Sequence, residues 1–310
     1  MEQVHKQKIL KWMVLPLVLL GIVLMSGTAP AGQENEAGQS PVLQRIMNSG
    51  VLRVGVNPLF KPFSFQDKNG NRVGVDVDVA GLLAKKLGVK LEVVVPGSFG
   101  ELIPMLTGNK IDLIAAGMSI TFNRAKVIDF TEPYFYTGLS ILLNKASSAR
   151  LGISAVPDYQ AMLRELGQNG KLSRLKIAVT RGKAPQQVVP RFFPGAKVIA
   201  YPSNEEAAAA TLEGETDIMV HDEIFLKVWL KEHAGEAKFR LTVLDPPFKP
   251  DFYAMAIAKG NQEFLNMLNV FILELQANSQ LEQFMGRYLP VKAKVITRSY
   301  NINEDYYGGD

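Results

Sequence analysis

Cysteine is missing from all 310 residues of the chain. This absence excludes disulfide bonds, and it excludes a lipid attached to an N-terminal cysteine. Histidine is scarce, with three residues in total, and their spacing resembles no zinc site. The chain also lacks the G-x-G-x-x-G, Walker and nucleophile-elbow patterns. We therefore expect no metal, no cofactor and no nucleophilic serine.

An excess of charge of either sign is also lacking. The chain carries 34 basic and 30 acidic residues, which gives a formal net charge of +4. Residues 1–31 contribute +2 of this, because three lysines outweigh one glutamate. The basic residues are scattered and rarely interleaved with aromatic residues, unlike the clustered face that neutralises phosphates. We therefore exclude nucleic acid as a partner.

The N-terminus carries a targeting signal. Three lysines precede an apolar run from residue 13 to 25, and the small residues Ala29-Pro30-Ala31 follow. This order is typical of a secretory signal peptide with an A-x-A cleavage site. The alternative, an uncleaved membrane anchor, needs roughly 20 apolar residues, and this run is shorter. We predict a cleaved signal peptide at residues 1–31 and a mature protein in the periplasm.

Beyond a polar, glycine-rich leader at residues 32–40, short β-type runs alternate with amphipathic helical segments. Strands that alternate with helices imply βαβ units and a largely parallel sheet, as in an α/β fold. The expected strands are residues 51–56, 91–95, 111–115, 175–180 and 252–257, and the expected helices are residues 43–48, 79–87, 99–106 and 263–288.

One unit occurs twice. In residues 106–114 a helix ends at a glycine and a strand begins near Asp112, and residues 212–220 repeat the pattern around Asp217, one residue shorter. A duplicated unit suggests two similar lobes. Ligands bind at the carboxyl ends of strands in open α/β sheets, so residues 117–119 and 221–223 should face one crevice.

The chain should therefore divide into two lobes with two crossings between them. Two crossings form a hinge rather than a single linker, and a hinge permits closure around a ligand. The first lobe comprises residues 41–143 and 250–290, the second residues 149–244, the crossings residues 144–148 and 245–249, and a C-terminal tail residues 291–310.

Five motifs in register resemble a known family. They are Gly74-Val-Asp76-Val-Asp78, Leu102-Ile103-Pro104, Lys110-Ile-Asp112, Gly117-Met-Ser119-Ile-Thr121-Phe-Asn-Arg124 and Phe130-Thr-Glu-Pro133-Tyr134. The series is similar to that of the family 3 extracellular solute-binding proteins, from about residue 51 to 289. The resemblance implies a two-lobed periplasmic-binding-protein fold of type II, with a mostly parallel sheet flanked by helices in each lobe and a two-strand hinge. It also implies a monomer that captures an amino acid and delivers it to a membrane ABC permease.

Residues of the first lobe suit a ligand carboxylate. Arg124 offers a planar guanidinium fork that matches a carboxylate with two hydrogen bonds. Ser119 and Thr121 follow a strand and precede a helix, so their backbone N–H groups should add to an anion site. Arg124 is also compatible with a solvated helix arginine paired with Asp129 or Glu132. The resemblance favours the ligand role.

The second lobe should supply the remaining polar contacts. Backbone N–H groups of Lys183 and Ala184 are expected to reach the ligand carboxylate, although Ala184 lacks the hydroxyl of the family's usual Gly-Thr-Thr turn. The Lys183 side chain either favours an acidic ligand or points to solvent. Asp222 matches the family's acidic position for the ligand ammonium, and its alternative role is a helix N-cap.

Aromatic side chains should form the walls of the pocket. By the resemblance, Phe60 stacks on the ligand side chain and Phe99 takes a corresponding place before the next helix. Ordinary core packing is the alternative for both. Asn57 and Gly117 complete the candidate set, Gly117 because it leaves space near the site.

The D-x-D pair formed by Asp76 and Asp78 superficially suggests a metal site. Both residues precede an expected helix. We therefore expect one of them to be an N-cap instead.

Two other functions are compatible with the same fold. A periplasmic dehydratase of the cyclohexadienyl type needs a general acid to protonate a leaving hydroxyl, and Glu223 or His221 are the candidates. A sensory receptor would report closure to a partner instead of delivering the ligand. Asp222 favours an amino acid over a substrate that lacks an ammonium group. We therefore predict a binding protein and no enzyme.

Overall fold

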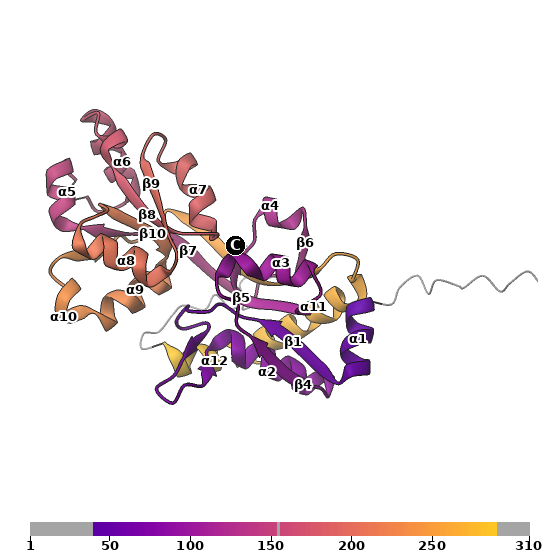
Figure 1. Cartoon of the computed structure of the whole chain (residues 1–310). Helices are drawn as coiled ribbons and strands as arrows, with labels where there is room; N and C mark the ends of the chain where they lie inside the picture. Colours follow the sequence, from indigo (N-terminus) through magenta and orange to yellow (C-terminus); the bar gives the residue numbers. More distant parts are fainter. Residues whose placement is uncertain (1–39, 154–155, 290–310) are drawn as a thin grey trace, which may run out of the picture. The chain divides into compact units, whose positions relative to one another are not determined.

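The computed structural model describes residues 40–153 and 156–289 (Figure 1). The predicted signal peptide, the predicted tail and all of the predicted leader except its last residue lie outside the described residues. The strands are β1 (Val51–Gly55), β2 (Phe65–Gln66), β3 (Arg72–Val73), β4 (Lys90–Val94), β5 (Leu113–Ser119), β6 (Ile128–Phe130), β7 (Phe135–Asn144), β8 (Lys176–Thr180), β9 (Lys197–Tyr201), β10 (Ile218–Asp222), β11 (Leu241–Val243) and β12 (Lys249–Ala258). The helices are α1 (Pro41–Ser49), α2 (Val75–Leu87), α3 (Leu102–Thr107), α4 (Phe122–Ala125), α5 (Lys145–Leu151), α6 (Tyr159–Gln168), α7 (Ala184–Phe192), α8 (Asn204–Glu213), α9 (Glu223–Glu232), α10 (Ala234–Ala237), α11 (Gln262–Ala277) and α12 (Gln280–Tyr288), with 3-10 helices η1 (Phe99–Glu101) and η2 (Leu172–Arg174).

The first lobe is built on the parallel strands β4, β1 and β5. β12 returns antiparallel to β5 and β6. Helix α2 packs on β1, β4 and β5, and α3 packs on β5 and β12. All seven residues of β5 are buried, as expected of a central parallel strand covered on both faces.

The second lobe repeats this plan. β10, β8 and β9 are parallel neighbours, and β7 runs antiparallel to β10 and β11. Helices α7 and α8 pack on β8 and β9. The predicted two-lobed α/β fold, with parallel strands and flanking helices in each lobe, is confirmed, but β7 and β12 join the strands of both lobes into one mixed sheet instead of two mostly parallel sheets.

The long strands β7 and β12 run between the lobes. The first half of β7 pairs antiparallel with β12, up to Leu139 opposite Lys249, and the second half pairs with β10, beginning with Leu139 opposite Asp222. A crossing between the lobes was expected at residues 144–148, but these residues end β7 and begin α5. Their polar character reflects a helix start, because Asn144 is the N-cap of α5.

The duplicated unit has the same geometry in both lobes. The Asp112 carboxylate accepts a hydrogen bond from the Arg53 backbone N–H at 2.9 Å, at the start of β5. The Asp217 carboxylate accepts one from the Lys176 backbone N–H at 2.8 Å, just before β10. Each aspartate therefore fixes the register of its strand against the neighbouring parallel strand.

Two local predictions differ from the structure. The single helix expected at residues 263–288 is two helices, α11 and α12, because Ser279 adopts a left-handed conformation with φ of 51° that interrupts the helix. Ser40, expected at the end of the leader, is buried instead. Its Oγ caps α1 and donates a hydrogen bond to Asn261 Oδ1 at 2.6 Å.

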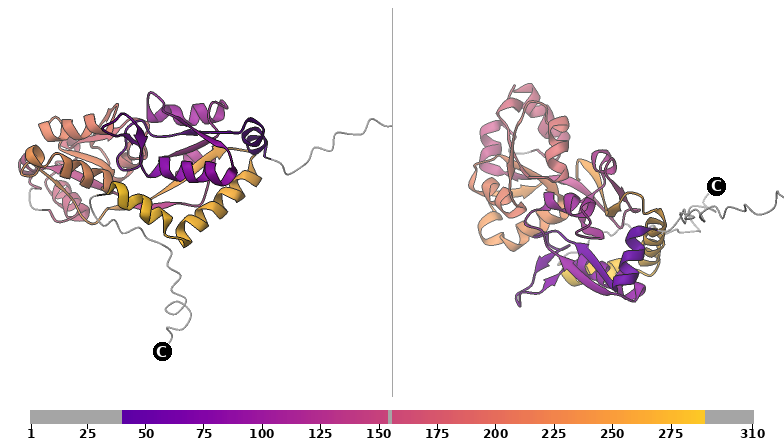
Figure 2. Two further views of the ribbon diagram at one scale, coloured as in Figure 1. Left: turned by 90° about the horizontal axis from the view of Figure 1, so that it is seen from below. Right: turned by 45° about the vertical axis from the view of Figure 1, so that its right-hand side comes forward.

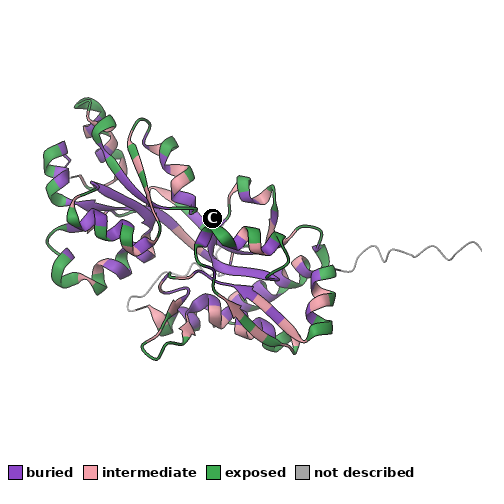
Figure 3. Cartoon of the chain, in the orientation of Figure 1, coloured by how far each residue is buried: buried purple, intermediate pink, exposed green. Residues whose placement is uncertain are grey.

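Buried residues follow the strands and the inward sides of the helices (Figure 3). One hydrophobic cluster joins the lobes, since the rings of Phe60 and Phe225 lie 6.3 Å apart. The orange to yellow helices α11 and α12 lie beside the first lobe, where α12 packs on α2 (Figure 2). Within residues 40–153 and 156–289, no helix is long and apolar enough to cross a membrane.

Candidate ligand-binding site

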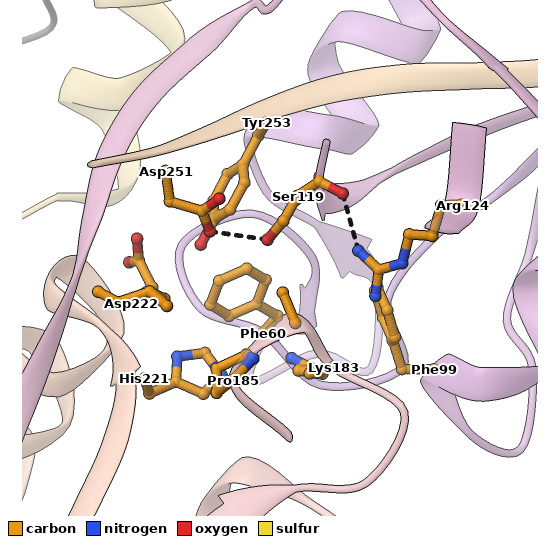
Figure 4. Close-up of a pocket in the computed structure, with 13 residues that line it drawn as sticks. Phe60, Phe99, Ser119, Arg124, Lys183, Pro185, His221, Asp222, Asp251 and Tyr253 are labelled. Atoms are coloured by element: carbon orange, nitrogen blue, oxygen red, sulfur yellow. Dashed lines mark hydrogen bonds between the residues drawn. The ribbon is translucent and has the colours of Figure 1, made fainter. Parts of the chain in front are cut away.

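A pocket lies between the lobes, at the carboxyl ends of β5, β8 and β10 (Figure 4). Its cavity volume is about 20 Å³, which is room for about one water molecule. The structure brings all predicted site residues except Asn57 and Thr121 to this pocket. The lining residues are Phe60, Phe99, Gly117, Ser119, Arg124, Leu139, Lys183, Ala184, Pro185, His221, Asp222, Asp251 and Tyr253.

Asn57 and Thr121 have local roles outside the lining. The Asn57 side chain accepts a hydrogen bond from Leu59 N at 3.3 Å and donates one to Ala116 O at 3.5 Å. Thr121 caps α4 and accepts a hydrogen bond from Arg124 N at 3.3 Å. Asn57 therefore shapes the turn after β1, and Thr121 positions the backbone of Arg124.

Arg124 is buried at the pocket and spans the lobes. Its Nη1 donates to Ser119 O at 2.8 Å, and its Nη2 donates to Gly182 O in the second lobe at 3.1 Å. The guanidinium carbon lies 5.4 Å from the centroid of the Phe99 ring. Burial lowers the pKa of Arg124 to about 10, so the group stays charged at neutral pH. A buried cation fixed by two carbonyls is pre-organised to receive an anion.

The alternative pairing of Arg124 with an acidic neighbour does not occur. Asp129 instead pairs with Lys259, whose Nζ lies 2.7 Å from the carboxylate. No ion pair of Arg124 occurs among residues 40–153 and 156–289. The guanidinium therefore faces the pocket without a carboxylate of the described chain bonded to it.

Asp222 combines the two roles that its sequence position suggested. It caps α9, because Oδ1 accepts hydrogen bonds from Ile224 N at 2.9 Å and Phe225 N at 3.1 Å. Oδ2 accepts the Thr137 hydroxyl, and the carboxylate also lines the pocket. Burial raises the pKa of Asp222 to about 6, and the Thr137 hydrogen bond opposes that rise. Asp222 therefore presents a fixed carboxylate from the second lobe.

Gly117 allows Phe60 to reach the pocket. A Cβ at Gly117 would lie 2.5 Å from Phe60 Cε1, and the residue has φ of 53°, which favours glycine. The Phe60 ring contacts both lobes, since it lies 6.1 Å from the Tyr253 ring and 5.6 Å from the His221 ring. Phe60 is therefore both a core residue and a pocket wall.

Lys183 and Ala184 begin the helix that follows β8. Lys183 is the N-cap of α7, and Pro185 occupies the first turn, where its missing N–H costs no helical bond. The Lys183 side chain turns into the pocket instead of into solvent, with Nζ 4.3 Å from the Phe60 ring centroid. Burial lowers the pKa of Lys183 to about 7, and the charge of Asp222 opposes that change.

Several lining residues were not among the predicted contacts. Asp251 and Tyr253 come from β12, and Leu139 comes from the strand paired with it, β7. Asp251 is buried and accepts the Ser119 hydroxyl at 2.7 Å, and burial raises its pKa. Asp251 and Tyr253 alternate along one strand, so their side chains point to the same face of the sheet. This spacing was the one sequence feature that could have indicated them as pocket residues, because no local motif marked them.

A second buried network lies beneath Gly117. The Gly117 backbone N–H donates to the Tyr134 hydroxyl at 3.2 Å, and this hydroxyl donates to Asp76 Oδ1 at 2.5 Å. Burial raises the pKa of Asp76 to about 7. The prediction that Asp76 or Asp78 caps a helix is wrong, because the N-cap of α2 is Gly74. Asp76 instead lies within the first turn of α2 and anchors Tyr134.

Glu223 and His221, the two candidates for the general acid of a dehydratase, differ in their position relative to the pocket. Glu223 does not line the pocket, and its carboxylate pairs with Lys227 at 2.7 Å. His221 lines the pocket, but burial holds its pKa well below the ordinary value. The described part of the chain contains no cluster of histidine and acidic residues arranged to hold a metal ion.

Comparisons with known proteins agree with this architecture. The chain is 29% identical over 245 residues to an L-arginine-binding protein of Pseudomonas aeruginosa, which covers 76% of this chain and 87% of that protein. It is also 29% identical over 198 residues to a cyclohexadienyl dehydratase of the same organism, covering 63% and 68% of the two chains. A solved structure of an ancestral arginine-binding protein bound to arginine matches with a TM-score of 0.66 and 31% identity, covering 77% of this chain and 98% of the other.

A family model matches residues 52–291, which is more than half of the chain. This range includes the second lobe, the first lobe without α1, both interlobe strands and every residue that lines the pocket. The chain belongs to the bacterial extracellular solute-binding proteins, family 3.

Proposed function

We propose that the protein captures a free amino acid in the pocket between its lobes and delivers it to an ABC importer. The observation that carries this proposal is a buried guanidinium, Arg124, facing the same pocket as a buried carboxylate, Asp222, from the opposite lobe. An amino acid carries one carboxylate and one ammonium, so these two groups complement it in charge. The arginine-binding relatives support the same class of ligand.

Ligand entry requires the lobes to separate. A cavity of about 20 Å³ does not hold an amino acid, and the Arg124 to Gly182 hydrogen bond closes one side of it. A surface ion pair between Lys61 and Glu232, 3.0 Å apart, also joins the lobes. The antiparallel strands β7 and β12 are the proposed hinge. The ligand then stabilises a closed form in which the lobes meet around it and leave a cavity larger than about 20 Å³, by its greater affinity for that form.

The partners and the location follow from the same proposal. We propose a periplasmic monomer that is exported through a cleaved signal peptide at residues 1–31. The closed, ligand-bound form would be the form that a membrane permease recognises. Recovery of a protein without its first 31 residues from the periplasmic fraction would support the location, and an intact N-terminus in washed membranes would contradict it.

A thermal-shift screen of the purified protein against the twenty amino acids tests the function. A ligand at about 100 times its dissociation constant should add about 2.7 kcal/mol to the free energy of unfolding. For a protein of this size, the midpoint should rise by roughly 4 to 6 °C. The proposal fails if none of the twenty shifts the midpoint.

Dehydration of a cyclohexadienyl substrate is the second candidate function. It is supported by the similarity of the chain to the P. aeruginosa cyclohexadienyl dehydratase. Such a reaction needs a group that donates a proton near neutral pH. Glu223 lies outside the pocket and the His221 pKa is well below its usual range, so neither supplies that group. Lys183 and Asp222 do line the pocket with pKa values of about 7 and 6, so the proposal of binding without catalysis rests on the binding-protein relatives and on the opposite charges of Arg124 and Asp222. Incubation with prephenate or arogenate should leave the ultraviolet absorbance unchanged, and the appearance of an aromatic product would contradict this.

A further inference from the structure

Lys183 places a cation of the protein against both aromatic walls of the pocket. Its Nζ lies 4.3 Å from the centroid of the Phe60 ring and 5.1 Å from that of the Phe99 ring (Figure 4). An ammonium within about 6 Å of an aromatic face is attracted by the ring. These are the two rings predicted to contact the side chain of the ligand. The space beside them is therefore shared with a positive charge.

The other charged groups of the pocket are hydrogen-bonded, whereas Lys183 is not. Arg124 donates to two carbonyls, Asp251 accepts the Ser119 hydroxyl, and Asp222 caps α9. Among residues 40–153 and 156–289, the Lys183 ammonium has no hydrogen-bond or ion-pair partner. The residue is only 7% exposed, and an ammonium with so little access to water and no partner is costly. A ligand that supplies a negative charge at this point removes that cost.

His221 offers a second unpaired polar group beside Lys183. Both ring nitrogens are buried and lack a hydrogen-bond partner within the described part of the chain. The imidazole is neutral at physiological pH, because burial and the charge of Lys183 hold its pKa well below the usual value. A neutral imidazole still has one N–H to donate. His221 therefore adds a donor to the cation of Lys183.

We propose that the pocket selects an amino acid whose side chain carries a carboxylate, and that Lys183 recognises this carboxylate. The inference rests on the proposed amino-acid function. Arg124 then takes the α-carboxylate and Asp222 the α-ammonium, which leaves Lys183 for the side chain. An arginine or lysine ligand would bring a second cation against Lys183 where little water screens the repulsion.

Calorimetry with L-glutamate, L-aspartate, L-glutamine and L-arginine tests the selection. The wild-type protein should bind glutamate or aspartate at least about 10-fold more tightly than glutamine and arginine. Lys183→Met keeps the length of the side chain and removes its charge. It should weaken the acidic ligand by about 30-fold or more, and glutamine by less than about 3-fold. Lys126→Met is the matched control, because Lys126 is an exposed residue at the end of α4 outside the pocket.

The outcomes separate this inference from the function on which it rests. Preference of the wild-type protein for arginine, or for a neutral amino acid, overturns the inference and leaves amino-acid binding intact. The same holds if Lys183→Met binds glutamate as tightly as the wild-type protein does. Failure of every amino acid overturns the proposed function itself. Lys183→Met removes a buried charge that has no partner, so this variant should stay folded. Lys183→Gln is a second variant without the charge, and circular dichroism should show that it is folded as well.

A pH series gives an independent readout. The ligand carboxylate favours the charged ammonium, whose pKa is about 7 before binding. Affinity for the acidic ligand should therefore fall as the pH rises above about 7, by up to about 10-fold per unit, and Lys183→Met should remove this dependence. A slope that persists in Lys183→Met contradicts the assignment. The charged and titratable groups that face Lys183 across the pocket are Arg124, His221, Asp222, Asp251 and Tyr253.

Discussion

Substitution of Gly117 by alanine should destabilise the protein by altering the floor of the pocket. The added Cβ would lie 2.5 Å from Phe60 Cε1 and 2.9 Å from Phe60 Cδ1. The ring has little room to retreat, since it packs 4.8 Å from the Phe63 ring and is 1% exposed. The substitution also places a side chain at φ of 53°.

Two penalties combine in this variant. A left-handed conformation costs a residue with a Cβ roughly 1 to 2 kcal/mol. Overpacking a core by one methyl group costs about 1 to 3 kcal/mol. The free energy of unfolding should therefore fall by about 2 to 5 kcal/mol. Any displacement of Phe60 from the pocket wall should also weaken ligand binding.

Urea denaturation of Gly117→Ala measures the loss directly, because a lower midpoint with an unchanged slope reports lower stability. Gly81→Ala is the matched control: Gly81 lies inside α2, and nothing lies within 4 Å of a Cβ there. This control should gain about 0.5 to 1 kcal/mol. If Gly117→Ala is as stable as the wild-type protein, the argument for a glycine beneath Phe60 is refuted.

Three further predictions concern charged residues away from the ligand contacts. The pKa of Asp76 is about 7 in the folded protein, against 3.8 ordinarily, so the folded state keeps a proton that the unfolded state loses between about pH 4 and 7. The free energy of unfolding should therefore fall across this window by up to about 4 kcal/mol. Denaturation from pH 4 to 8 should show a shallower fall for Asp76→Asn than for Asp78→Asn or the wild-type protein, and equal slopes would contradict this. Asp112→Ala removes a fully buried carboxylate that pairs with two arginines and should cost about 2 to 4 kcal/mol in urea denaturation, whereas a loss below about 1 kcal/mol would show that the pair contributes little. Lys61→Ala breaks an exposed pair and should change stability by less than about 0.5 kcal/mol, so a larger loss would show that this contact holds the lobes together.

Much of the fold was predictable because it depends on local and periodic signals. The duplicated unit around Asp112 and Asp217 predicted two similar lobes, and the order of motifs indicated the family. The hinge position was less accessible. The position of the hinge depends on how far β7 continues before α5 begins. From the sequence alone, the polar residues 144–148 fit a linker as well as they fit the start of a helix.

The site could be predicted only where a motif marked it. Arg124 and Asp222 lie next to strand ends that the pattern identified. Asp251 and Tyr253 enter the pocket from the return strand β12, and their pairing with β7 joins residues more than 100 positions apart. The direction of the Lys183 side chain depends on the cavity between the lobes, so the sequence left two orientations open.

Calorimetry on Arg124→Ala and Asp222→Asn tests the central claim, amino-acid capture between the lobes, most directly. Each variant should bind the ligand found in the amino-acid screen about 30-fold more weakly or worse, because one half of a buried charged pair is lost. Asp222→Asn keeps a competent N-cap, so it should stay folded and should bind a des-amino analogue nearly as well as the wild-type protein does. Arg240→Ala and Asp245→Asn, at exposed positions outside the pocket, should bind normally. If both pocket variants are folded and bind the amino acid as tightly as the wild-type protein, the proposed site is contradicted.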